Sequence, residues 1–186
     1  MPVLTITALA ATLVGTATRV SGSGVLYALR RDPTELAHGQ LWRLVSPVLV
    51  QSDRSWWAIA GVFLLCAAIG VVGERLLPRA EWALLYLIGA LTGHGIGEFF
   101  QPHQSGMSVA FVAILGGIAA HALIRPEGVP WQWRARFAAL IPLALLDTAL
   151  RDIHGAPFLA GLVAGVLFEM HARRALEQTR THSAPA

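Results

Sequence analysis

Ser108 and His154 each stand at the start of an apolar run, and these two residue types together can perform nucleophilic catalysis. A serine hydroxyl is a poor nucleophile unless a base within hydrogen-bond reach takes its proton, and neutral histidine is the commonest such base. Exposed backbone N–H groups in the first turn of a helix that begins at Ser108 would also stabilise an oxyanion. A serine–histidine pair would explain why this apolar run opens with polar and small residues.

The same residues are also ordinary helix caps, and I-H-G-A-P at 153–157 is typical of a helix with Pro157 in its first turn. Spacing alone favours this capping interpretation. Asp147 and Asp152 are candidates to orient the ring of His154, although either could instead pair with Arg151. The chemistry therefore depends on which of these side chains the fold brings together.

A second set of titratable residues, His94, Glu98 and His103, has a spacing that could bind a metal ion. His94 and Glu98 are four residues apart and would share one face of a helix. A zinc site would need another committed ligand, so interfacial polar residues or mutual hydrogen bonding is the preferred interpretation. The single cysteine, Cys66, lies inside an apolar run and offers neither a disulfide nor a thiolate cluster. We expect no metal and no organic cofactor.

The composition is that of an integral membrane protein. Of the 186 residues, 55% are hydrophobic and 13% are charged, and the mean hydropathy is +0.57. All 14 basic residues are arginine, which suggests a bacterial genome of high GC content. The net charge of +3 does not indicate a nucleic-acid partner, because the arginines lie singly or in pairs at the ends of apolar runs. There they are typical of topology signals.

Six apolar segments are each close to the roughly 20 residues that a helix needs to cross a bilayer. They cover residues 3–28, 56–73, 80–98, 107–124, 133–150 and 155–171. The sequence therefore predicts an all-α polytopic bundle with six transmembrane helices over residues 1–171. A short polar cytoplasmic tail, 172–186, would follow, disordered in its last ten residues. A cleaved signal peptide is the alternative for the first segment, although the charged n-region is missing.

The arginines also predict the orientation in the membrane. Eight of them mark the cytoplasmic loops and the tail: Arg75, Arg79, Arg125, Arg134, Arg136, Arg173, Arg174 and Arg180. The connection between the third and fourth segments contains no arginine and is therefore expected outside the cell. We expect a multi-pass protein of the plasma membrane with both termini in the cytoplasm. Ser108 and His154 then lie at the same outer face. The first loop, 29–55, carries four arginines and is an exception to this rule.

Four blocks of sequence occur in an order and at spacings that resemble those of the rhomboid intramembrane serine protease family, over residues 41–170. They are L-W-R-L-V-S-P at 41–47, G-E-R-L-L-P-R-A-E-W-A-L-L-Y-L-I-G-A-L-T-G at 73–93, G-M-S-V-A-F-V-A-I-L-G-G at 106–117 and H-G-A-P-F-L-A-G-L-V-A-G at 154–165. The resemblance implies a six-helix rhomboid-like bundle and the hydrolysis of peptide bonds in or near membrane spans.

The resemblance assigns structural roles to five residues. Trp42 and Arg43 match the Trp-Arg pair of the family's first external loop, and Gly116 matches a glycine eight residues after the nucleophile. Gly161 and Gly165 match paired glycines of the last span. Their four-residue spacing, also present at positions 89, 93 and 97, independently predicts closely packed helices.

The resemblance also assigns the catalytic roles. Ser108 matches the nucleophile of the family's Gly-x-Ser-Gly motif, and His154 takes the role of the base near the start of the last span. Gly106 and Met107, just before the nucleophile, are then expected to contribute to oxyanion and substrate binding. Ser105 is the fallback nucleophile, ranked lower because the glycine at 116 favours the other register.

Three positions depart from the family's pattern. Val109 replaces the last glycine of the nucleophile motif, which crowds the backbone there. Phe158 stands where the histidine usually lies, and His154 is one helical turn earlier. The family often has a His and an Asn in its second span that help to bind the oxyanion, and neither is found around Ala58 and Val62.

Three hypotheses follow. The leading one is a serine endopeptidase acting on transmembrane protein substrates within the lipid bilayer, with a water-filled cavity at the depth of the serine. Gly95, Ser105, Gly106 and Gly155 are small enough to leave room for that cavity. The second is an inactive relative that binds membrane helices as clients, which a wide serine–histidine separation would support. The third is a small transporter or metal-binding protein that uses the residues at 94, 98 and 103.

Overall fold

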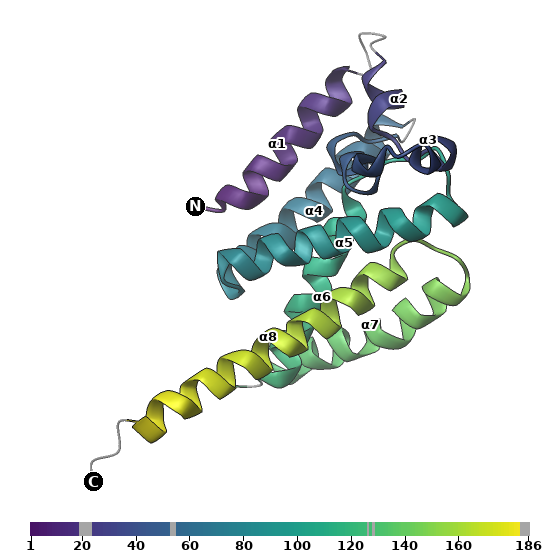
Figure 1. The fold of residues 1–186 in the computed structure, drawn as a ribbon. Coiled ribbons are helices and arrows are strands. Elements are labelled where there is room, and N and C mark those ends of the chain that lie inside the picture. The colour runs from purple at the N-terminus through teal and green to yellow at the C-terminus, as the bar shows by residue number, and fades with distance from the viewer. Residues whose placement is uncertain (19–23, 53–54, 126, 128, 183–186) are drawn as a thin grey trace.

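The computed structural model describes residues 1–18, 24–52, 55–125, 127 and 129–182, and every regular element within those ranges is a helix (Figure 1). The α-helices are α1 Val3–Thr18, α2 Val25–Leu29, α3 Pro33–Ala37, α4 Trp56–Leu76, α5 Arg79–Phe100, α6 Ser108–Ile124, α7 Trp131–Ala149 and α8 Gly155–His182. Two 3₁₀-helices, η1 Leu41–Leu44 and η2 Ser46–Leu49, lie in the long first loop.

Two of the predicted boundaries are wrong. The first apolar segment was expected to be one helix over 3–28, but α1 ends at Thr18 and α2 is separate. The sequence between them contains an S-G-S-G run of low helix propensity, and residues 19–23 lie outside the described part of the chain. At the other end, α8 continues to His182, so the tail expected to be disordered is helical as far as it is described. Ala, Arg, Leu, Glu and Gln dominate this extension and are strong helix formers.

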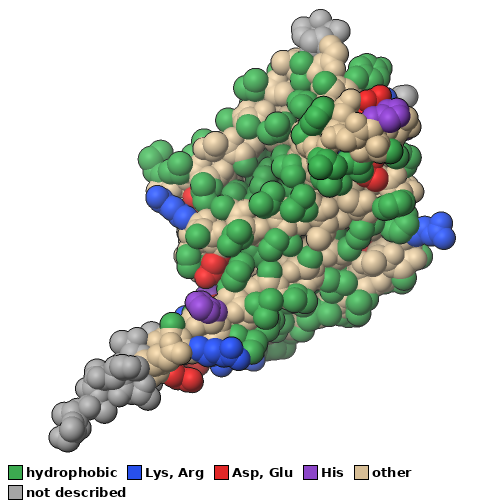
Figure 2. All heavy atoms as spheres, viewed as in Figure 1, with side chains coloured by type: hydrophobic (Ala, Val, Ile, Leu, Met, Phe, Trp, Pro, Cys, Tyr) green, Lys and Arg blue, Asp and Glu red, His purple; other side chains and the backbone are tan. Residues whose placement is uncertain are grey.

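Three helices are long and apolar enough to cross a membrane, namely α4, α5 and the stretch Gly155–Ala175 of α8. The apolar helices α1 and α6 are shorter. Figure 2 shows hydrophobic side chains spread over the visible face, with most charged side chains toward its edges. A water-soluble protein would not expose such a surface, so the chain is an all-helical membrane protein.

Helix α6 lies in the centre of the bundle and packs against α4, α5, α7 and α8. Its neighbours approach closely because glycines face it. A Cβ at Gly161 would lie 2.0 Å from the Ala113 carbonyl oxygen, and one at Gly165 would lie 2.8 Å from the Ala120 Cβ. On α6 itself, a Cβ at Gly116 would lie 2.2 Å from the carbonyl oxygen of Phe158. The close packing predicted for Gly161 and Gly165 is confirmed.

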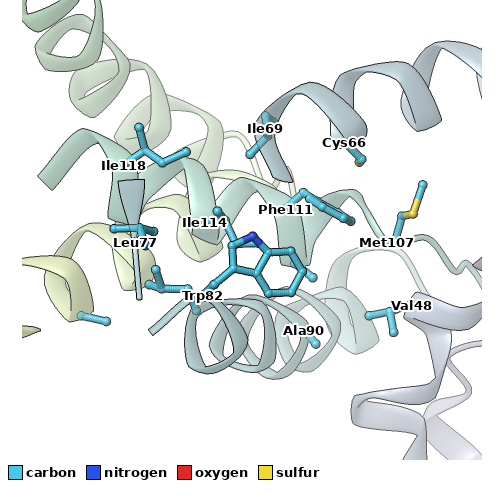
Figure 3. Packing of buried hydrophobic residues seen from close by; sticks show 13 residues of the cluster. Val48, Cys66, Ile69, Leu77, Trp82, Ala90, Met107, Phe111, Ile114 and Ile118 are labelled. Carbon is cyan, nitrogen blue, oxygen red and sulfur yellow. The ribbon is translucent and has the colours of Figure 1, made fainter. Parts of the chain in front are cut away.

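Buried residues of α4, α5 and α6 form one hydrophobic core, in which Trp82 of α5 lies near Phe111 of α6 (Figure 3). Trp82 stacks on Tyr86 with 5.4 Å between the ring centroids. Both rings make T-shaped contacts with Phe111. The indole N–H of Trp82 donates to the Gly70 carbonyl oxygen at 3.2 Å, so the buried donor is satisfied. This core fixes α6 against α4 and α5.

Both ends of the described chain, the N-terminus and the last turn of α8, lie on the left of Figure 1. The α7–α8 connection and the end of α5 lie on its right. Helix α1 is tied to α4 through Glu74, which accepts hydrogen bonds from Leu4 N at 3.2 Å and Thr5 N at 2.6 Å. The carboxylate thus satisfies two free N–H groups at the start of α1.

Candidate active site

Ser108 is the first residue of α6, and the chain before it is held in place by η2 and by the segment that follows η2. Gly106 N donates to the Pro47 carbonyl oxygen at 3.0 Å, and Met107 N donates to Gln51 Oε1 at 3.3 Å. Met107 is fully buried and Gln51 is almost so. The sequence analysis missed Gln51, because a lone polar residue in an irregular loop carries no periodic signal.

His154 is positioned by the turn that ends α7. Arg151 adopts a left-handed conformation with φ of 63°, and its N–H donates to the Thr148 carbonyl oxygen at 3.1 Å. Asp152 N donates to the Asp147 carbonyl oxygen at 2.8 Å. These two bonds form a Schellman motif, which usually has glycine at the left-handed position. The turn then presents His154 immediately before α8.

Ser108 Oγ and His154 Nε2 lie 2.9 Å apart, within hydrogen-bond distance. The other ring nitrogen, Nδ1, lies 2.8 Å from Asp152 Oδ1. An ionised carboxylate can only accept, so Nδ1 carries the proton and Nε2 is left to accept from the serine hydroxyl. This is the tautomer in which a histidine can act as a general base toward a serine.

Asp152 is held ionised by its neighbour. Partial burial raises the pKa of its carboxyl group, but hydrogen bonds from the His154 backbone N–H and ring, with the charge of that ring, outweigh burial. The net effect is a pKa below the usual value for aspartate. The side chains of Asp152 and His154 are 43% and 38% exposed, so both reach water.

Ser108 and His154 open into a cavity of about 280 Å³. Its walls are apolar where α4 contributes Leu65 and Cys66, and polar where the loops contribute Gln51. Ser105 and Gly106 line it, as expected of small residues. Gly95 and Gly155 do not line this cavity; a Cβ at Gly155 would lie 2.2 Å from the Ala144 carbonyl oxygen, so its small size serves helix packing.

Ser105, the fallback nucleophile, forms no hydrogen bond with His154 among the described residues. Its backbone pairs with Ser52 instead: Ser105 N donates to Ser52 Oγ at 3.1 Å, and Ser52 Oγ donates to Ser105 O at 2.9 Å. The Ser105 hydroxyl is buried and has no hydrogen-bond partner in the part of the chain that the structure describes. The structure brings Ser108, and not Ser105, to the histidine.

Gly106 and Met107 were expected to help bind an oxyanion, but both of their N–H groups already donate within the protein, as described above. Among the hydrogen bonds of the described residues, none uses the N–H of Ser108. This group lies in the first turn of α6, where backbone donors have no acceptor in the helix. It is the better candidate for an oxyanion donor.

Two departures from the expected motif have a structural explanation. Val109 is 1% exposed and packs over Gly93, where a Cβ would lie 2.4 Å from the Val109 Cβ. The extra bulk beside Ser108 is thus accommodated by a glycine on α5. Phe158 is 3% exposed and packs in an apolar cluster with Ala119 and Ala144, so its position holds no base.

Arg43 stabilises the first loop, whose residues Arg31, Gln51 and Ser52 line the cavity. It is 6% exposed; its Nη1 donates to the carbonyl oxygens of Tyr27 and Arg30 at 2.9 and 2.8 Å, and its Nε donates to Gln40 Oε1 at 2.8 Å. Trp42, its predicted partner in the motif, is 56% exposed. A surface tryptophan next to apolar helices is typical of a membrane interface.

His94, Glu98 and His103 do not converge. His94 Nδ1 pairs with Arg31 Nη1 at 2.9 Å, and His103 Nδ1 lies 3.6 Å from a carboxylate oxygen of Asp32. Within the described residues, no three His, Cys, Asp or Glu side chains are grouped so that they could hold a metal ion. Arg31, which the sequence analysis missed, is 1% exposed and lines the cavity.

Comparisons with known proteins point to one family. The family described as Rhomboid domain matches residues 38–174. The chain is also similar to a protein named Rhomboid protease GluP of Bacillus subtilis (strain 168), with 24% identity over 137 residues. That match covers 73% of this chain but 27% of the relative, so the chain spans about a quarter of the length of that protein.

The family match takes in α4 to α7, most of α8, and both residues of the Ser108–His154 pair. It begins just before η1, so α1 lies outside it. The matched region covers well over half of the sequence, and this chain belongs to the rhomboid family.

Proposed function

We propose that this chain is a rhomboid-type serine endopeptidase that hydrolyses peptide bonds in or near the transmembrane segments of other membrane proteins. The observation that carries the proposal is the 2.9 Å distance between Ser108 Oγ and His154 Nε2, in a cavity lined by polar loops. The name of its Bacillus relative, a rhomboid protease, is consistent with the same chemistry.

The reaction would proceed through an acyl-enzyme. Ser108 Oγ attacks the scissile carbonyl carbon while its proton moves to His154 Nε2, and the carbonyl electrons form an oxyanion near the Ser108 N–H. Collapse breaks the C–N bond, and the leaving amine takes the proton from His154. A water molecule then attacks the acyl carbon and gives its proton to His154. The second collapse releases the carboxylic acid and returns the proton to Ser108.

We further propose that α1, α4, α5, α6, α7 and α8 all cross the bacterial plasma membrane, which gives the six spans expected from the sequence. The N-terminus and the end of α8 lie on one side of the bundle in Figure 1, which supports two cytoplasmic termini. The arginines of the α4–α5 and α6–α7 connections support the same orientation. Cysteine-accessibility labelling of Thr181→Cys and Gln104→Cys in intact cells would test it, since only the second should react from outside.

A relative that binds membrane helices without cleaving them is the second candidate. Two observations favour it: Phe158 occupies the family's usual histidine position, and α4 has no polar pair near Ala58 and Val62. The short distance between Ser108 and His154 favours the peptidase instead, because a non-cleaving relative has no need to keep this hydrogen bond.

Labelling with a fluorophosphonate probe separates the two candidates. The detergent-solubilised wild type, Ser108→Ala, Ser105→Ala and His154→Ala are compared, with thermal unfolding as a check that each is folded. We expect labelling of the wild type and of Ser105→Ala, and loss of labelling in the other two. A folded wild type that is not labelled would favour the non-cleaving relative.

A further inference from the structure

Asp152 makes two contacts with His154 through one oxygen atom. Its Oδ1 accepts from the His154 backbone N–H at 2.8 Å and lies 2.8 Å from the ring Nδ1. The first bond fixes the backbone just before α8, and the second fixes the plane and tautomer of the ring. One carboxylate therefore controls both the position and the protonation pattern of the base.

The turn that supplies this carboxylate is strained. Arg151, immediately before Asp152, is one of two non-glycine residues with positive φ in the described part of the chain. A left-handed conformation is unfavourable at such a residue, because its Cβ comes too close to the following carbonyl oxygen. Strained residues persist where the surrounding structure fixes them, and they cluster at functional sites. Here the strained residue aims the next side chain at the base.

Other charges near the histidine do not take this role. Asp147 of α7 lines a neighbouring hollow with His154, but no hydrogen bond joins its carboxylate to the ring. The Arg151 guanidinium lies over the ring of Phe100 at 6.0 Å. Arg31 lines the main cavity and is bound to His94 and to the Gln101 carbonyl oxygen. Among the charged side chains that the structure describes, only Asp152 is hydrogen-bonded to the ring.

We infer that Asp152 is a positioning residue that completes a serine–histidine–aspartate triad with Ser108 and His154. This inference rests on the proposed function. The carboxylate holds the imidazole with its Nε2 lone pair toward Ser108 and stabilises the imidazolium that forms when the serine proton arrives. Asp152 itself stays ionised throughout, so no proton is transferred to it.

The test compares Asp152→Asn, Asp152→Ala and the matched control Asp147→Asn. Asparagine keeps an oxygen that can accept from the His154 backbone N–H, so Asp152→Asn should fold; it removes only the charge. The rate of fluorophosphonate labelling is measured for each variant from pH 5 to pH 9, beside thermal unfolding.

We expect Asp152→Asn to label about tenfold more slowly than the wild type, and Asp152→Ala about a hundredfold more slowly. The low-pH side of the curve of labelling rate against pH, its acidic limb, should lie at lower pH for Asp152→Asn than for the wild type, because the imidazolium has lost its carboxylate partner. A purely structural role would lower the rate without moving that limb. Asp147→Asn, which removes an equal charge nearby, should keep the wild-type rate and profile.

Three outcomes would overturn the inference. The first is a labelling rate and a pH profile of Asp152→Asn that equal those of the wild type. The second is a lower labelling rate of Asp152→Asn with an unmoved acidic limb. The third is the same shift of the acidic limb in Asp147→Asn, which would indicate a general effect of the electric field. Failure of the proposed function is distinguishable from these, because the folded wild type itself would then not be labelled at Ser108.

Discussion

Replacing Gly116 with alanine tests whether the crossing of α6 and α8 sets the distance between nucleophile and base. A Cβ at Gly116 would lie 2.2 Å from the Phe158 carbonyl oxygen and 2.7 Å from the Leu162 nitrogen. Both are backbone atoms, so no side chain can rotate away. Since ordinary contact begins at 3.4 Å, the two helices must separate by roughly 1 Å.

That separation acts directly on the site, because Ser108 begins α6 and His154 directly precedes α8. A hydrogen bond of 2.9 Å that lengthens by about 1 Å is no longer a hydrogen bond. We expect Gly116→Ala to lower the rate of fluorophosphonate labelling by about 10²-fold, since a displacement of this size commonly costs that much. Overpacking should also lower the free energy of unfolding by about 1–3 kcal/mol.

The assay measures labelling rates and thermal unfolding of the solubilised protein. Gly95→Ala is the matched control: this glycine is also inside a helix, and a Cβ there would meet nothing within 4 Å. It should keep the wild-type rate and gain slightly in stability from the better helix propensity of alanine. A folded Gly116→Ala protein labelled within about threefold of the wild-type rate would refute the reasoning.

Four further predictions follow from single contacts. Val109→Ala should lower the free energy of unfolding by about 1–3 kcal/mol, because the side chain fills the space over Gly93; unchanged thermal unfolding would contradict this. Glu74→Gln should lower it by about 1 kcal/mol through weaker bonds to the start of α1, and an unaltered unfolding midpoint would count against that role. Phe158→His in a His154→Ala background should not restore labelling, since the imidazole would be buried in an apolar cluster; recovered labelling would show otherwise. The pKa of Asp152 is lowered in the folded state, so its charge stabilises the fold fully above the ordinary aspartate value and loses this effect as pH falls through the lower folded value. The difference in unfolding midpoint between wild type and Asp152→Asn should therefore shrink at strongly acidic pH, and a difference that stays undiminished there would refute it.

The helices of the bundle could be predicted from the sequence because apolar runs near 20 residues long have few alternatives in a membrane protein. Glycine spacing likewise predicted the close packing at positions 161 and 165, since small residues let backbones approach. The end of the first helix was harder to place, because apolar residues continue on both sides of the interruption. The helical extension of α8 was missed because its residues are polar, although their helix propensity is high.

The sequence singled out Ser108 and His154, and it offered Asp147 and Asp152 as alternative partners for the histidine ring. Ser108 and His154 are marked by position at the start of apolar runs, whereas the contacts that support them join distant parts of the chain. Gln51 contacts Met107 across the first loop, and no local pattern indicates that pairing. The role of Asp152 depends on the left-handed conformation of Arg151, at a position where glycine would have been the usual signal.

The position of the histidine changes which part of the fold the reaction depends on. In the family's usual arrangement, the base would stand where Phe158 is, inside the body of α8 and one turn further along. Here the proposed base, His154, lies in the α7–α8 connection, so its geometry depends on the turn at Arg151 and on the Asp152 carboxylate. A base inside a helix is oriented by its own backbone and by neighbouring helices, whereas a base in a turn needs a partner to hold it. The position of the histidine therefore accounts for a carboxylate at its ring, and it makes the end of α7 part of the proposed active site.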